Sequence, residues 1–183
     1  MKGSLVKYVL RLSLTLLAIT ALVAAALAGV NAITEDRIAQ QKQEKIQKAI
    51  AQVLPGAKVS GQVEFEDASG LVGAVYESDL GYAVEVVPAG FGGGITMMVG
   101  ITREGKVSGV AVVSHTETAG LGSVAAANTA AGEAFRNQFL GASGPLAVDK
   151  DGGEIDSITS ATITSRAVVT GVNAALETVK NLG

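Results

Sequence analysis

The sequence predicts an α+β domain anchored by one N-terminal transmembrane helix. Three observations indicate this: a long uncharged segment near the N-terminus, four short segments of strand character, and two later segments with apolar residues at helical spacing. Strands followed by helices are typical of α+β folds, in which helices cover an antiparallel sheet. With 183 residues, of which 48% are hydrophobic, the chain is long enough for one buried core and one additional segment.

The first element is a transmembrane helix predicted over residues 12–33. This segment has 22 residues without a charged side chain, and a helix needs about 20 to cross a bilayer. Three basic residues precede it: Lys2, Lys7 and Arg11. No acidic residue occurs before Glu35, so the positive-inside rule predicts a cytoplasmic N-terminus over residues 1–11. A cleaved signal peptide is the alternative, because Ala26-Leu27-Ala28 resembles a cleavage site.

The composition excludes several kinds of chemistry. The chain has no cysteine and one histidine, which argues against disulfides, iron–sulfur ligation and a nitrogen-rich metal site. Beyond residues 1–11, 11 Lys and Arg stand against 17 Asp and Glu, a formal charge of −6. We expect no nucleic-acid partner with that charge balance. A redox role would require an organic cofactor.

The second element is a stalk helix predicted over residues 34–56. Apolar residues recur there at roughly helical spacing: Ile38, Ile46, Ala49, Ile50 and Val53. Pro55-Gly56 ends the pattern, because this pair does not continue a helix. We therefore expect a single extracytoplasmic domain over residues 57–183.

Two β-hairpins are predicted at the start of this domain. The first joins residues 70–77 to 81–87, and the second joins residues 95–101 to 106–113. The second turns at Arg103-Glu104-Gly105, where glycine permits the turn conformation.

Two helices are predicted after the hairpins. Residues 123–140 are rich in alanine and place Phe135 and Phe139 four positions apart. Residues 165–182 carry one apolar face: Val168, Val169, Val172, Leu176 and Val179. The hydroxyl-rich segment 156–165 comes immediately before this second helix. Small side chains and the free N–H groups of a helix start favour a phosphate, although Thr164 or Ser165 could instead be a simple helix cap.

Two further polar segments fall outside these elements. Residues 89–94 contain four glycines, which permit close approach to a ligand or form a flexible turn. In residues 114–122, His115 and Glu117 suggest acid–base chemistry, but no nucleophile or metal set accompanies them, and no catalytic residue is predicted. This segment is interpreted as a polar loop that binds a ligand, or as a capped loop leading into a helix.

Together these segments resemble the FMN-binding RnfG subunit of the Rnf electron-transport complex, a relative of the NqrC subunit of the sodium-pumping NADH:quinone reductase. The resemblance covers nearly the whole chain and includes the N-terminal span, the Gly-rich loop leading into Met98-Val99-Gly100-Ile101, and residues 115–122. Its most specific part is Thr159-Ser160-Ala161-Thr162-Ile163-Thr164-Ser165. The corresponding family motif reads Ser/Thr-Gly-Ala-Thr, any residue, then Thr or Ser.

The resemblance implies that Thr162 carries FMN through a phosphoester. It implies a phosphate-side turn of Thr159, Ser160 and Ala161. It also implies a flavin-lining set of Glu117, Thr118, Leu121 and Gly122. The chain departs from the family at Ser160, where glycine is usual, and at Ala119, where proline is frequent. Serine could weaken recognition by the flavin transferase that attaches FMN, and alanine loosens the loop without removing its polar groups.

The resemblance implies an electron-carrier subunit in a membrane-bound, ion-translocating ferredoxin:NAD oxidoreductase complex. Its partners would be the other membrane subunits and a flavin transferase. No catalysis is expected from the isolated subunit. Two alternatives remain: the NqrC subunit of the sodium-pumping reductase, and a non-enzymatic, membrane-anchored binding or scaffold protein.

Overall fold

The computed structural model describes residues 2–182 and divides the chain into two compact units, residues 1–44 and 45–183. One helix, α1 (Lys2–Val53), belongs to both units. Within the described residues, α1 is the one helix long and apolar enough to cross a membrane, with a mean hydropathy of 2.3 in its apolar part. The predicted span therefore lies in a continuous helix and forms a possible membrane anchor.

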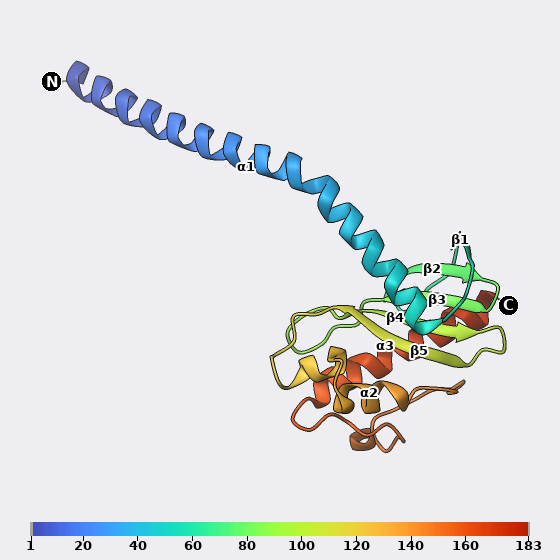
Figure 1. The fold of residues 1–183 in the computed structure, drawn as a ribbon. Coiled ribbons are helices and arrows are strands. Elements are labelled where there is room, and N and C mark those ends of the chain that lie inside the picture. The colour runs from blue at the N-terminus through green and yellow to red at the C-terminus, as the bar shows by residue number, and fades with distance from the viewer. Residues whose placement is uncertain (1, 183) are drawn as a thin grey trace. The chain divides into compact units, whose positions relative to one another are not determined.

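The second unit is an α+β domain built on a five-stranded antiparallel sheet, as predicted (Figure 1). Its strands pair in chain order. They are β1 (Val59–Val63), β2 (Val72–Ser78), β3 (Gly81–Val86), β4 (Thr96–Thr102) and β5 (Val107–Ser114). The sequence predicted β2 to β5 with small boundary differences. It missed β1, an exposed edge strand that Gly61 interrupts with a bulge.

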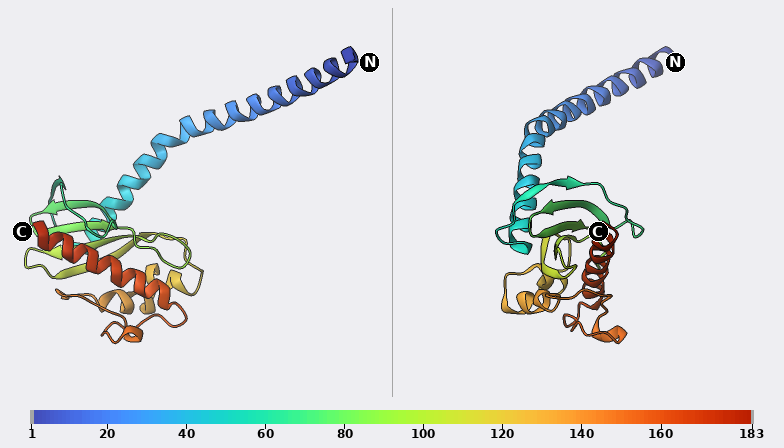
Figure 2. Two further views of the ribbon diagram at one scale, coloured as in Figure 1. Left: turned by 180° about the vertical axis from the view of Figure 1, so that it is seen from behind. Right: turned by 90° about the vertical axis from the view of Figure 1, so that its right-hand side faces the viewer.

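Helices follow the sheet. Helix α3 (Thr162–Leu182) extends along the sheet in Figure 2, and its buried valines pack on the apolar side chains of β3 and β4. The predicted helix over residues 123–140 is wrong as a single element. A 3-10 helix, η1 (Gly122–Ala126), and helix α2 (Ala130–Asn137) replace it. A second 3-10 helix, η2 (Asp149–Asp151), lies between α2 and α3.

The break comes from a capping signal. Ala127 is extended, with φ −69° and ψ 141°, and the Thr129 side chain accepts a hydrogen bond from the Gly132 N–H at 3.3 Å. Threonine at this position satisfies a free N–H of the new helix, so α2 begins afresh at Ala130. Phe135 and Phe139 still meet edge to face in the core, with ring centroids 5.6 Å apart.

The sheet is buried on both faces because α1 ends on the face opposite α3. Ile46, Ala49, Ile50, Val53 and Leu54 pack there against Ala83, Met98 and Ala111. A Cβ at Gly100 or Gly109 would collide with Val53, so these glycines let the helix approach the sheet closely. The Ser108 hydroxyl donates to the Val53 carbonyl at 2.6 Å.

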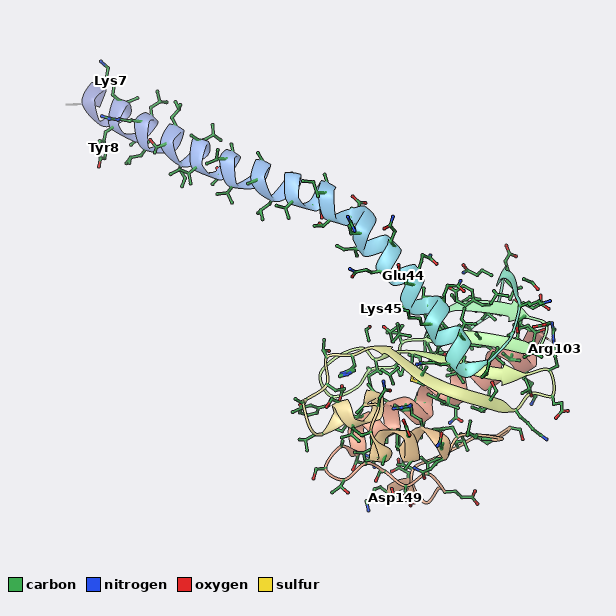
Figure 3. The ribbon with its side chains drawn as sticks, in the orientation of Figure 1. Lys7, Tyr8, Glu44, Lys45, Arg103 and Asp149 are labelled. Carbon is green, nitrogen blue, oxygen red and sulfur yellow. The ribbon has the colours of Figure 1, made fainter. Side chains whose placement is uncertain are left out.

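The compact unit therefore begins at Lys45, ahead of the boundary expected near residue 57. Figure 3 labels Glu44 and Lys45 at this transition. The last two turns of α1 are part of the domain core rather than part of a separate stalk.

Candidate functional site

The antiparallel sheet brings the ends of three segments together around one cavity. Thr96 of β4 pairs with Ser114 of β5, so the Gly-rich loop before β4 lies beside the loop after β5. The first turn of α3 completes the cavity, whose volume is about 350 Å³. Its lining residues are Phe91, Glu117, Thr118, Leu121, Gly122, Ser160, Ala161, Thr162, Ile163 and Thr164.

Glu117 links all three segments and is only 9% exposed. Its Oε1 accepts a hydrogen bond from the Gly92 N–H at 2.9 Å, and its Oε2 accepts one from the Thr164 hydroxyl. We call this arrangement the Glu117 clasp. An ionised carboxylate is well suited to it, because both oxygens accept.

Two glycines allow the clasp to close. A Cβ at Gly122 would collide with the Glu117 carboxylate and the Thr164 hydroxyl. A Cβ at Gly92 would collide with the Thr116 carbonyl. The Thr116 hydroxyl also donates to the Gly92 carbonyl at 2.8 Å, so the Gly-rich loop is held at a fixed position. The flexible-turn alternative for this loop is therefore not needed.

The turn before α3 runs from Ile158 to Ala161, whose N–H donates to the Ile158 carbonyl at 2.9 Å. Ser160 occupies the third position with φ 62°, and it is the one non-glycine residue with positive φ among residues 2–182. Glycine is favoured in this left-handed region because it has no Cβ. The family's glycine at this position thus has a conformational reason, and serine adopts the same conformation.

We expect Ser160→Val to lower the free energy of unfolding by about 1–2 kcal/mol, because a β-branched side chain is strained at positive φ. Ser160→Gly should change it by less than about 1 kcal/mol, since relief of strain opposes the added backbone entropy of glycine. Urea unfolding of the full chain in detergent measures both. Equal stability of the valine variant and the wild type would contradict the conformational argument.

The hydroxyls of the segment separate into buried and accessible ones. Thr164 and Ser165 are 1% and 0% exposed. Ser165 accepts from the Ile158 N–H at 2.9 Å and donates to the Ala161 carbonyl at 3.1 Å. The idea that Thr164 or Ser165 caps the helix is wrong, because α3 already begins at Thr162 and both lie inside its first turn. Thr162 is half-buried and lines the cavity.

The structure gathers seven of the eight site residues predicted from the sequence. Thr159 is the exception, because it lies in an adjoining depression of about 530 Å³ lined also by Gln138 and Asp156. The sequence reasoning missed Phe91, Ile163 and Thr164 as lining residues. A large aromatic residue surrounded by glycines was the available signal for Phe91.

His115 is absent from the residues that line the cavity. Its Nδ1 accepts a hydrogen bond from the Glu117 N–H at 3.2 Å, so it holds the loop. The acid–base pair considered from the sequence therefore does not form, since the Glu117 carboxylate faces Gly92 and Thr164.

A larger groove of about 800 Å³ lies at the other end of β4. Arg103, labelled in Figure 3, lies along it and is held by the Ser78 carbonyl at 2.6 Å and by Glu77 at 3.0 Å. We assign function to the smaller cavity, because three separate segments build it around an accessible hydroxyl and the first turn of a helix.

Charged groups order the segment that leads to α3. Hydrogen bonding to Ser157 lowers the pKa of Asp149, which Figure 3 labels. The paired hydrogen bonds from Arg166, at 2.6 and 2.7 Å, lower the pKa of Asp151 below its ordinary value of 3.8. Arg166 is one helical turn after Thr162, so this pair connects η2 to the start of α3.

The lowered pKa values predict an acid-sensitive segment. A carboxyl whose pKa is lower in the folded state stabilises it above the unfolded value of 3.8, and this stabilisation is lost as pH falls through the folded value. We expect the thermal unfolding midpoint to fall with pH below about 4, with a shallower fall for Asp151→Asn. Midpoints measured at a series of pH values check this, and identical slopes for the two proteins would contradict it.

Fold and site together define a helix-anchored flavin-binding domain. A family model for the FMN-binding domain matches residues 90–177, and a model for the RnfG N-terminal region matches residues 1–53. The domain match includes every lining residue of the cavity. The chain belongs to the RnfG family of Rnf complex subunits.

Full-length relatives agree with this family, and all three described here bear the subunit letter G. The relative from Aliivibrio fischeri, of an ion-translocating oxidoreductase complex, is 36% identical, covering 87% of this chain and 85% of the relative. The relative from Acetobacterium woodii, of a Na⁺-translocating ferredoxin:NAD⁺ oxidoreductase complex, is 30% identical over 96% and 94% of the two chains. The proton-translocating counterpart from Clostridium ljungdahlii is 36% identical over 78% and 76%. The chain is therefore a subunit of a multi-subunit redox complex and carries an FMN-binding domain.

Proposed function

We propose that this protein is the electron-carrier subunit of an ion-translocating ferredoxin:NAD oxidoreductase complex, and that it holds FMN through a phosphoester to Thr162. The observation that carries the proposal is the position of the Thr162 hydroxyl. It lies at the first residue of α3 and lines the cavity, whereas Thr164 and Ser165 are buried and already hydrogen-bonded.

The residues of the cavity fit the two ends of FMN. The first N–H groups of a helix have no intrahelical partner and its N-terminal dipole is positive, so the start of α3 suits a phosphate. Apolar side chains, namely Phe91, Leu121 and Ile163, suit the flavin ring. Thr162, Ser160 and Ala161 would hold the phosphate end, and Glu117, Thr118, Leu121 and Gly122 would lie along the flavin. Bound FMN would supply the electron-transfer chemistry.

The surroundings of Thr162 support attachment by a separate flavin transferase. A threonine hydroxyl needs a base to become a nucleophile. The nearby candidates are already engaged: Glu117 accepts from Thr164 and Gly92, and the His115 Nδ1 accepts a backbone N–H. The Thr162 oxygen would replace the leaving group on the phosphorus of a flavin dinucleotide, its proton passing to a base of the transferase.

The proposal includes a location for each part. Residues 12–33 would cross the membrane, residues 1–11 would lie in the cytoplasm, and the compact unit from Lys45 would lie outside. The basic residues before the span support this orientation. A covalent link would prevent loss of the cofactor from an extracytoplasmic domain.

The match of the first 53 residues to the RnfG N-terminal region favours this complex over the sodium-pumping quinone reductase. The FMN-binding domain match disfavours a scaffold without a cofactor.

The test is co-expression of the full chain with a flavin transferase, followed by denaturing electrophoresis and peptide mass spectrometry. We expect a fluorescent band and a mass increase of one FMN on the peptide that contains Thr162. A colourless protein, or a flavin on another residue, would overturn the proposed attachment. Protease accessibility of the domain in oriented membrane vesicles tests the location separately.

A further inference from the structure

The rim of the cavity exposes large apolar side chains to solvent. Within residues 45–182, seven large hydrophobic side chains are exposed: Val59, Leu80, Val87, Phe91, Leu121, Leu140 and Ile163. Three of these seven line this one cavity, with exposed fractions of 68% for Phe91, 51% for Ile163 and 42% for Leu121. Such a concentration around one hydroxyl indicates a surface that something apolar covers.

Phe91 is presented on a loop that is held in place. The Gly90 N–H donates to the Gly93 carbonyl at 2.7 Å, which closes the loop on itself. The Gly92 N–H and carbonyl bond to Glu117 at 2.9 Å and to the Thr116 hydroxyl at 2.8 Å. The backbone on both sides of Phe91 is therefore fixed while its ring remains exposed, which is an arrangement prepared for contact before a ligand arrives.

We propose that Phe91 is a flavin-positioning residue whose ring packs against the isoalloxazine ring of the flavin on Thr162, with Ile163 and Leu121 completing an apolar seat. This inference rests on the proposed function, because it takes the tethered flavin as the occupant. Aromatic rings gain about 0.5–1.5 kcal/mol from stacked or edge contacts beyond burial alone.

The tether makes the chain's own flavin the first occupant of this rim. A group linked by a short flexible chain experiences an effective concentration in the millimolar range. Thr162 and Phe91 line the same cavity, so the ring of a flavin attached to Thr162 reaches Phe91 within one molecule. A partner protein that diffuses in would meet the rim already covered.

A tryptophan probe tests the contact directly. The chain has no Trp, and an indole in contact with a flavin quenches its fluorescence. In the full chain with FMN attached, we expect Phe91→Trp to cause a severalfold loss of flavin fluorescence. The matched control is Leu80→Trp, because Leu80 is 47% exposed in the β2–β3 turn, outside this cavity. That variant should leave the fluorescence unchanged.

Removal of the ring tests the same contact in the opposite direction. Phe91→Ala should increase quenching of the attached flavin by iodide, while the flavin content per chain measured by mass spectrometry stays unchanged and Phe91→Tyr restores protection. In a Thr162→Val background, Phe91→Ala should weaken riboflavin binding by about 2- to 12-fold.

The outcomes separate the inference from the proposed function. Flavin attached to Thr162 with the same fluorescence and iodide quenching in all Phe91 variants would overturn the ring contact alone. If Phe91→Ala then also slowed electron delivery within the complex, the rim would be a protein-docking surface instead. Wild-type protein without attached flavin would overturn the proposed attachment, and failure of riboflavin to bind would overturn the contact as well.

Discussion

Replacement of Thr162 by valine is expected to abolish covalent flavin attachment. Valine has nearly the shape of threonine but lacks the oxygen that would form the phosphoester. Because Thr162 is half-buried and is the first residue of α3, valine should fit without disturbing the helix. The fluorescent band after denaturing electrophoresis, which is the measurement, should therefore disappear while the amount of folded protein stays the same.

The matched control is Thr159→Val in the same turn. Thr159 is exposed and lies in the adjoining depression, so its hydroxyl is not available inside the cavity. This variant should keep its flavin. Transfer of the flavin to another hydroxyl in Thr162→Val, or loss in Thr159→Val alone, would contradict the assignment.

Replacement of Glu117 by alanine should have the largest effect on stability. It leaves the Gly92 N–H and the buried Thr164 hydroxyl without the acceptors that they have in the folded state. An unsatisfied buried polar group costs about 1–3 kcal/mol. We expect a loss of about 2–4 kcal/mol in the free energy of unfolding, because water that enters the open cavity offsets part of the cost. Urea unfolding, followed by tyrosine fluorescence, measures it.

Glu117→Gln separates the hydrogen bonds from the carboxylate charge. Glutamine can accept the Gly92 N–H and donate to the Thr164 oxygen, since a hydroxyl also accepts. This variant should retain most of the stability and of the flavin attachment, whereas Glu117→Ala should lose both. If the alanine variant unfolded at the same urea concentration as the wild type, the clasp would not hold the three segments together.

The sequence predicted the elements that carry a strong local signal. Alternating side chains and a glycine turn identified the two hairpins, and the valine face identified α3, because each pattern reports the periodicity of its own backbone. It could not separate η1 from α2, since the alanine-rich stretch has high helix propensity throughout and the Thr129 cap that interrupts it is one residue. The exposed strand β1 has no buried face and so no alternation.

The motif around Thr162 named most of the candidate site, because the family resemblance fixes residue types in order. It could not find Phe91, which is separated from Thr162 by most of the domain sequence and joins the cavity only through the pairing of β4 with β5.

By itself, the sequence determined the apolar span, the α+β class and the residues that identify the family, because these depend on composition and local order. The tertiary structure alone decided that the end of α1 belongs to the core and that the buried Thr164 is bonded to Glu117. It also decided that Ser160 takes a glycine's conformation and that Phe91 faces the Thr162 cavity. These features depend on contacts between distant segments, which the folded backbone brings within a few ångströms and no local pattern encodes.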